Sequence, residues 1–258
     1  MDGAMLDDDA LSRSTRVAVG DPLRIDDELL EVLESGRFGV QYEPIVDIAT
    51  GETIAYEALA RFHGADGRTF SPAKVFAWLH GAPSLLVETE LALKRLQLER
   101  APNHTLFVNL DPDSYHGAPG AGAALLRLLG QARVDVVVEA IENIDAASAE
   151  RNRHMVAGLR GAGIPFALDD VGAANGLVSF DMLAFADYLK LDRSLVRAPR
   201  EPRRLAVAEA LVAMTARTGA RAVMEGIETK DDLELARDLG IGLVQGYLYR
   251  DRFIRVKP

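Results

Sequence analysis

Eight short runs rich in apolar and β-branched residues alternate along the chain with stretches of helical periodicity. The runs are GVQYEPIV from Gly39, TIAYEAL from Thr53, TLFVN from Thr105, VDVVVE from Val134, PFALD from Pro165, DYLKL from Asp187, ARAVME from Ala220 and GLVQG from Gly242. The clearest helical stretches begin at Leu85 and Arg203. Eight strands with interleaved helices predict an α/β fold, a barrel of the (β/α)8 type.

The connection between the first two predicted strands modifies this barrel. Only the six residues DIATGE separate them. Six residues cannot form the crossover that parallel strands need, but they are enough for a hairpin. We therefore predict a TIM-like barrel variant in which the first strand is antiparallel to the second. We expect residues 23–258 to form this barrel, and residues 1–22, rich in Asp, Ser and Arg, to be an N-terminal tail or linker.

Composition excludes several classes of function. The chain has no cysteine, so disulfides, thiolate metal sites and cysteine nucleophiles are ruled out. A net charge of −10 without a basic block argues against a nucleic-acid polymer as the main partner. No apolar run approaches the roughly 18 residues of a membrane span, and the acidic start MDGAMLDDDALSRS is unlike a signal peptide. We therefore expect a cytoplasmic protein without membrane insertion.

From the second strand onward, each predicted strand closes on polar residues. These residues are Glu57, Asn109, Glu139, Asp169 with Asp170, Lys190, Glu225 and Gln245. The C-terminal strand ends of such a barrel meet on one face, so five carboxylates would share a small site and repel one another unless cations neutralise them. Mg²⁺ or Mn²⁺ suits carboxylate and amide oxygens. A shared Asp169 could bridge two ions roughly 3.5–4 Å apart.

Taken singly, these residues also have structural explanations. Asp169 and Asp170 could cap the following helix, and Lys190 could extend its ammonium to the surface. Glu225 and Glu228 could be acids that favour the first turn of a helix. Their recurrence at successive strand ends favours a common site.

A series of segments between Asp26 and Phe253 resembles one known family. The segments are EPIVDIATGETIAYEALARF, FVNL, VVVEAIE, ALDD, LKLDRSLV, MEGIET and QGYLY. In their order and approximate spacing they resemble the EAL domain, the bacterial cyclic di-GMP phosphodiesterase, whose name motif is similar to Glu57-Ala58-Leu59. The resemblance covers nearly the whole chain and implies a TIM-like barrel with its first strand reversed.

The resemblance also implies an activity and a set of roles. The implied reaction is the hydrolysis of cyclic di-GMP to linear pGpG, in bacterial signal transduction, by a water that two Mg²⁺ or Mn²⁺ ions activate. Implied metal ligands are Glu57, Asn109, Glu139 and Asp169 for the first ion, and Asp169 and Asp170 for the second, with Glu225 in or near its shell. Lys190 would polarise the water. Arg61, Glu228 and Gln245 would position substrate or the shell around it, and Glu142 would anchor the loop after the two aspartates. Family members commonly dimerise near that loop, so we expect a homodimer.

Two departures from the family pattern leave a second reading open. Glu43 stands where the family usually has a glutamine close to substrate, so its carboxylate either repels a phosphate or accepts from guanine N–H groups. The loop over residues 171–178 reads VGAANGLV in place of the usual glycine and serine pattern. The alternative function is a degenerate EAL domain that binds cyclic di-GMP or a protein partner without significant hydrolysis. Arg250-Asp251-Arg252, where the family often has proline, suggests only a surface change.

Overall fold

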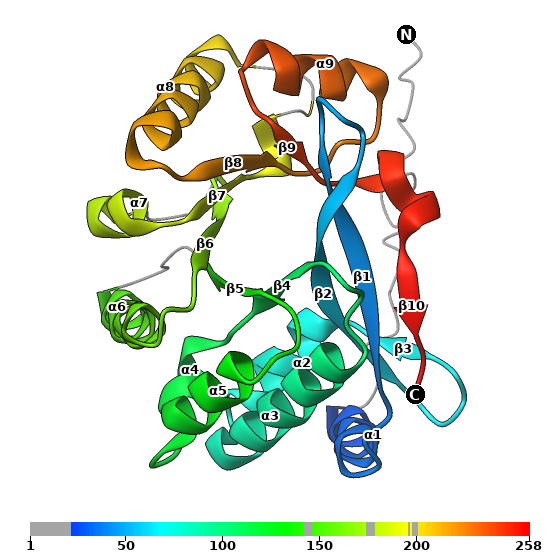
Figure 1. The fold of residues 1–258 in the computed structure, drawn as a ribbon. Coiled ribbons are helices and arrows are strands. Elements are labelled where there is room, and N and C mark those ends of the chain that lie inside the picture. The colour runs from blue at the N-terminus through cyan, green and yellow to red at the C-terminus, as the bar shows by residue number, and fades with distance from the viewer. Residues whose placement is uncertain (1–21, 142–145, 174–178, 196, 198–200) are drawn as a thin grey trace, which may run out of the picture.

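The structure, a computed structural model, describes residues 22–141, 146–173, 179–195, 197 and 201–258. Within this part of the chain, eight strands close into a barrel because β1 pairs with both β9 and β2 (Figure 1). The barrel strands are β1 (Phe38–Asp47), β2 (Thr53–His63), β4 (Thr105–Asn109), β5 (Val136–Ile141), β6 (Phe166–Val171), β7 (Tyr188–Leu191), β8 (Arg221–Met224) and β9 (Leu243–Val244). All eight predicted strands are therefore confirmed.

The direction of the first strand agrees with the hairpin argument. β1 is antiparallel to β2, with Glu43 opposite Glu57, and it is also antiparallel to β9. Every other neighbouring pair in the barrel is parallel. Two short strands that the sequence did not predict extend the sheet: β3 (Thr69–Phe70) pairs with β2, and β10 (Ile254–Val256) pairs with β1.

Helices surround the barrel on its outside, as Figure 1 shows. They are α1 (Pro22–Glu34), α2 (Pro72–Leu79), α3 (Pro83–Glu99), α4 (Pro112–His116), α5 (Ala121–Gly130), α6 (Ala146–Gly161), α7 (Phe180–Phe185), α8 (Pro202–Thr218) and α9 (Lys230–Asp238), with the 3₁₀ helices η1 (Arg193–Leu195) and η2 (Tyr247–Arg252). The helical stretches predicted from Leu85 and Arg203 are α3 and α8.

The bounds of α8 follow from its capping residues. The Glu201 side chain accepts hydrogen bonds from the backbone N–H groups of Arg203 and Arg204, which have no partner within the helix. Pro202 occupies the first turn, where its missing N–H costs nothing. At the other end, Gly219 adopts φ 81°, a left-handed conformation that ends the helix at low cost.

One layer of the barrel interior is apolar, and each of the eight barrel strands contributes one side chain to it. Its members are Ile45, Ala55, Phe107, Val137, Ala167, Tyr188, Val223 and Leu243. Such a layer makes the barrel a packed core rather than a pore. A larger apolar cluster lies between the strands and the outer helices, and a third joins α1, α2 and α3 to β1 and β2.

Among the residues that the structure describes, no helix combines the length and the apolar character needed to cross a membrane.

Candidate active site

The candidate site is the next layer of the same barrel interior. Side chains two residues apart on a strand point to the same face. On each barrel strand a polar side chain lies two residues from the member of the apolar layer. It follows that member on seven strands and precedes it on the reversed strand β1. These side chains are Glu43, Glu57, Asn109, Glu139, Asp169, Lys190, Glu225 and Gln245. The alternation of the strands therefore brings eight predicted site residues, Glu43 among them, into one polar layer next to the apolar one.

The ammonium of Lys190 is the centre of this layer. Its Nζ lies 2.5 Å from Glu139 Oε1, 2.7 Å from Glu225 Oε1, 2.9 Å from Asp169 Oδ1 and 3.3 Å from Glu57 Oε2. The side chain is 1 % exposed. One buried positive charge thus faces four carboxylates, so the alternative in which Lys190 reaches the surface is excluded.

Burial and mutual charge interactions shift the pKa values of the groups in this layer. Burial alone would lower the pKa of Lys190, but Asp169 and Glu139 raise it well above its usual range. Burial, and then the charge of Glu57, raises the pKa of Glu139 well above normal. Burial also raises the pKa of Glu225 to about 8. One ammonium is therefore too little positive charge for this set of acids.

Polar residues also hold Glu57 in place. Gln245 Nε2 donates to Glu57 Oε2 at 2.6 Å, and Asn109 Nδ2 donates to Glu57 Oε1 at 3.1 Å. Burial would raise the pKa of Glu57, but Lys190 and the Gln245 hydrogen bond hold it below its usual value. The Glu57 carboxylate is therefore oriented and charged in the absence of any ligand.

The end of β6 carries an irregularity that presents both aspartates. Between Leu168 and Val171 the strand has one residue more than the facing segment of β7, which is a β-bulge. Asp170 adopts φ 53°, and among the described residues it is the single non-glycine with a positive φ. Burial and the adjacent charge of Asp169 raise the pKa of Asp170 to about 6. A strained bulge of this kind is common beside active sites.

The chemistry of these groups fits divalent cations. One carboxylate oxygen from each of Asp169, Asp170 and Glu225 lies within 4.8 Å of the other two. Apart from Lys190, the described residues offer no amide, guanidinium or hydroxyl donor to either carboxylate oxygen of Glu139. An oxygen donor set with excess negative charge suits a hard cation such as Mg²⁺, Mn²⁺ or Ca²⁺.

Glu43 stands at the edge of the layer, directly opposite Glu57. Gln41 Nε2 donates to its Oε1 at 2.7 Å, while Arg61 Nη2 lies 3.8 Å away. Burial raises the pKa of Glu43 despite the Gln41 hydrogen bond. Arg61, one of the predicted substrate residues, is therefore adjacent to this carboxylate.

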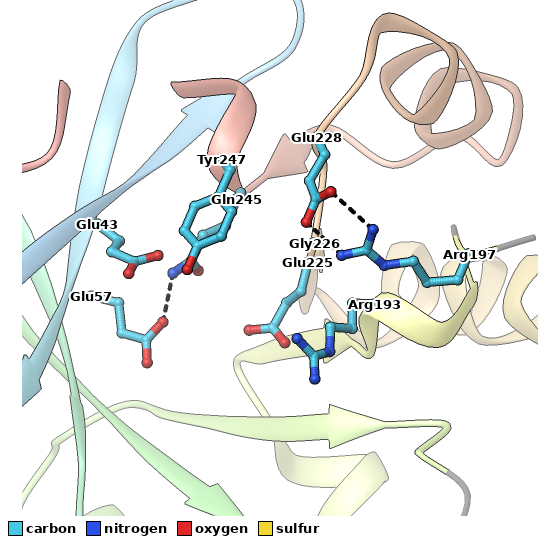
Figure 2. A pocket seen from close by; sticks show the side chains of 10 residues that line it. Glu43, Glu57, Arg193, Arg197, Glu225, Gly226, Glu228, Gln245 and Tyr247 are labelled. Carbon is cyan, nitrogen blue, oxygen red and sulfur yellow. Dashed lines mark hydrogen bonds and ion pairs between the residues drawn. The ribbon is translucent and has the colours of Figure 1, made fainter. Parts of the chain in front are cut away.

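A cavity of about 200 Å³ opens above the layer. Figure 2 shows Glu43, Glu57 and Gln245 on one wall and Glu225, Glu228, Arg193 and Arg197 on the other. Glu228 accepts from both terminal nitrogens of Arg197, at 2.9 and 2.5 Å. The sequence did not single out Arg193, Arg197 or Tyr247. Arg193 begins η1, Arg197 follows it and Tyr247 begins η2, so none of them lies in a strand whose periodicity could mark it.

Two other predicted features lie outside the described residues. They are the anchor Glu142 and most of the altered loop, residues 174–178.

A second acidic cluster has an ordinary structural role. His80 Nε2 lies 2.7 Å from Asp111 Oδ2, with Asp113 close by. Asp111 caps α4 by accepting from the Asp113 backbone N–H, and Asp113 forms an ion pair with Arg151 at 2.6 Å. Helix capping and ion pairing account for these contacts.

The barrel and its polar layer define an α/β-barrel protein with an acidic site suited to divalent cations. The sequence profile of the EAL domain matches residues 26–251, and the chain belongs to the EAL-domain family.

Curated relatives and a solved structure agree with this assignment. Cyclic di-GMP phosphodiesterase NbdA of Pseudomonas aeruginosa is 25 % identical over 249 residues, which cover 92 % of this chain and 32 % of NbdA. Cyclic di-GMP phosphodiesterase TpdA of Vibrio parahaemolyticus is 28 % identical over 217 residues, 82 % of this chain and 36 % of TpdA. The chain thus spans about a third of the length of these relatives. The calcium and cyclic di-GMP complex of Klebsiella pneumoniae BlrP1 has a TM-score of 0.69 and 27 % identity, covering 82 % of this chain and 55 % of that one.

Proposed function

We propose that this chain hydrolyses cyclic di-GMP to linear pGpG with the help of two divalent cations, Mg²⁺ or Mn²⁺. The observation that carries the proposal is the polar layer, in which the buried Lys190 ammonium contacts four carboxylates. The names of the relatives NbdA and TpdA support cyclic di-GMP as the substrate. The calcium and cyclic di-GMP complex of BlrP1 supports a requirement for cations.

The proposed metal ligands are members of the polar layer, together with Asp170. Glu57, Asn109, Glu139 and Asp169 would hold one ion, and Asp169 and Asp170, with Glu225 nearby, would hold the other. When bound, such ions lower the pKa of a water and neutralise charge that develops on the phosphoryl oxygens. The excess of carboxylates over the single Lys190 ammonium is the physical reason for expecting them.

The chain's own residues would orient the reaction. Lys190 donates a hydrogen bond to the attacking water and so directs its lone pair at phosphorus. The water oxygen forms a new P–O bond while the P–O3′ bond breaks, and the proton released from the water ends on the 3′ oxygen. Arg61, Gln245 and Glu228 would position the substrate at the cavity rim. This assignment uses neither a serine nor a cysteine nucleophile.

A second cavity supports a guanine nucleotide as substrate. It has a volume of about 360 Å³ and is lined by Arg61, Asn109 and the buried side chains of Glu90 and Gln97. Within the described part of the chain, Gln97 Oε1 has no hydrogen-bond donor. Guanine presents N–H donors on its base edge, and the Gln97 carbonyl oxygen in this cavity suits them.

The direct test incubates the purified protein with cyclic di-GMP and Mg²⁺ or Mn²⁺ and follows pGpG by chromatography. We expect product from wild type, loss of product with Glu57→Ala, and normal turnover with Glu52→Ala, an exposed glutamate in the same hairpin. Absence of product at high protein concentration, with Glu57→Ala indistinguishable from wild type, would contradict the proposal.

The second candidate function is that of a degenerate EAL domain, which binds cyclic di-GMP or a protein partner without significant hydrolysis. The observation that favours it is Glu43, whose carboxylate lies beside Arg61 in the cavity wall. Calorimetry with Ca²⁺ in place of Mg²⁺ distinguishes the two candidates: binding without turnover in any cation identifies a receptor, and the absence of binding heat excludes cyclic di-GMP as ligand.

We also propose that the protein is a cytoplasmic homodimer in bacterial second-messenger signalling. Phe180 and Phe185 on α7 are 89 % and 51 % exposed, and exposed aromatic side chains are common at protein–protein interfaces. Light scattering on the purified chain tests this expectation. A monomer mass at all concentrations would contradict it.

A further inference from the structure

The turn that follows Asp170 is tied to helix α8 by one side chain. Arg204 Nη2 donates to the carbonyl oxygen of Gly172 at 2.5 Å and to Ser194 Oγ at 2.7 Å. Gly172 lies two residues after Asp170, and Ser194 belongs to η1, three residues beyond the end of β7. Arg204 therefore connects the segment that follows β6, which carries the two aspartates, with the segment that follows β7, which carries Lys190.

This segment depends on local contacts for its conformation. Asp170 and Gly172 both have positive φ, 53° and 93°, and a non-glycine residue in that region is strained unless its surroundings hold it there. Two backbone hydrogen bonds close the turn, from Ala173 N–H to Asp170 and from Asp192 N–H to Val171. Among the described residues, Arg204 gives the turn its one side-chain donor.

The other end of the contact is fixed as well. Arg204 lies in the first turn of α8, where its backbone N–H donates to the Glu201 side chain at 2.9 Å. Ser194 is held in turn, because its backbone N–H donates to Asp192 Oδ1 at 2.9 Å. The guanidinium thus joins the strained turn to two elements that are themselves hydrogen-bonded.

We infer that Arg204 is a positioning residue for Asp170: by holding the Gly172 carbonyl, it keeps the Asp170 carboxylate directed at the proposed second cation. The inference rests on the proposed function, since it requires that Asp170 binds a cation. Residues that orient metal ligands typically change metal affinity by about 10–100-fold when they are removed.

Charge alone predicts the opposite effect. Arg204 is a cation, and removing a cation near a divalent site reduces repulsion and so raises the affinity for metal. Loss of affinity on removing Arg204 would therefore report the contact with Gly172. Arg203 provides the matched control, because it precedes Arg204 in the same turn of α8, is exposed and carries the same charge.

The test is calorimetric titration of the metal-free protein with Mn²⁺, which does not depend on turnover. For Arg204→Met we expect one of two binding events to weaken about tenfold, whereas Arg203→Met should bind Mn²⁺ at least as tightly as wild type. Arg204→Lys should recover part of the affinity, because its ammonium can donate to both acceptors. The thermal midpoint of the metal-free protein is measured alongside, since general destabilisation moves that midpoint without weakening one binding event selectively.

The outcomes separate this inference from the proposed function. If wild type binds Mn²⁺ and Arg204→Met binds it equally well, or if both binding events weaken equally, the inference is overturned while the proposed function stands. If wild type binds no Mn²⁺, the proposed function fails and the inference with it. Should Arg204→Met not fold, Arg204→Gln, whose amide is too short to span both acceptors, is titrated with the same two criteria.

Discussion

Lys190 Nζ lies 2.5 Å from Glu139 Oε1, and both side chains are at most 1 % exposed. Moving each of these charges out of water costs roughly several kcal/mol, and only close, well-oriented contacts offset that cost. Here the ammonium also contacts Asp169, Glu225 and Glu57, so the site keeps an excess of negative charge. The proposed cations would neutralise this excess.

Replacing Lys190 with methionine should therefore destabilise the metal-free protein and be compensated by metal. Loss of the ammonium leaves buried acids without a counter-charge, which typically costs about 3–5 kcal/mol. Mn²⁺ supplies positive charge at the same acids and should restore most of the loss. Thermal unfolding with Mn²⁺ and with chelator measures the difference. Turnover should fall about 100-fold or more because the attacking water loses its donor.

Lys94 is the control for this prediction. It forms a comparably buried ion pair with Glu90, 2.8 Å apart, on α3. Lys94→Met should destabilise the protein similarly, but Mn²⁺ should not compensate because Glu90 lies outside the polar layer. Equal compensation of both variants by Mn²⁺ would show that the metal acts elsewhere.

Cation affinity should rise with pH. Burial and neighbouring acids raise the pKa of Glu225 to about 8 and that of Asp170 to about 6. At neutral pH without metal, Glu225 is mostly protonated, so a cation that binds it must release a proton. For each proton released, the apparent Kd for Mn²⁺ falls up to about tenfold per unit of pH increase while the pH is below the pKa of the group. Above that pKa the Kd no longer changes with pH. Calorimetry in buffers of different ionisation heat measures this release. A Kd for Mn²⁺ that is constant from about pH 6 to pH 8 would contradict the prediction.

The strand pattern made most of the fold and polar layer predictable. Glu57, Asn109 and Lys190 each stand two residues beyond an apolar position in a short strand, and a period of two places both on one face. The reversed β1 followed from loop length alone. The strands β3 and β10 were missed because two or three residues show no period.

The features that sequence could not give depend on contacts between distant segments. The bulge at Asp170 arises from the pairing of β6 with β7, which no local pattern encodes. Arg197 follows η1, and its position against Glu228, which precedes α9, depends on how two loops pack. Gln41 became relevant only because β1 places it two residues from Glu43, on the same face.

Changing Glu43 to glutamine should strengthen cyclic di-GMP binding. The residue lies opposite Glu57 and beside Arg61, so its negative charge opposes a phosphate near that guanidinium. Unit charges 4 Å apart interact by about 1 kcal/mol in bulk water and about 4 kcal/mol near a protein surface. We expect about tenfold lower Kd for cyclic di-GMP, measured by calorimetry with Ca²⁺ to prevent turnover.

Glu52→Gln controls for the change in net charge, since Glu52 is exposed in the turn between β1 and β2. It should bind like wild type. An unchanged Kd in Glu43→Gln would mean that Glu43 accepts from guanine N–H groups or stays clear of the ligand.

Gly246 should be intolerant of any side chain. It adopts φ 155° and ψ −178°, and a Cβ there would lie 2.2 Å from the Ile227 carbonyl oxygen. The close approach of Gly246 and Ile227 joins the segments that carry Gln245 and Glu228. Ile227 N–H donates to the Gln245 carbonyl oxygen, and Leu248 N–H donates to that of Ile227. Gly246→Ala should cost about 1–3 kcal/mol of unfolding free energy in urea titrations, as overpacking typically does, and should separate the two loops. Gly242→Ala, where a Cβ meets no atom within 4 Å, should be nearly neutral, and equal losses in the two variants would contradict a role for this close approach.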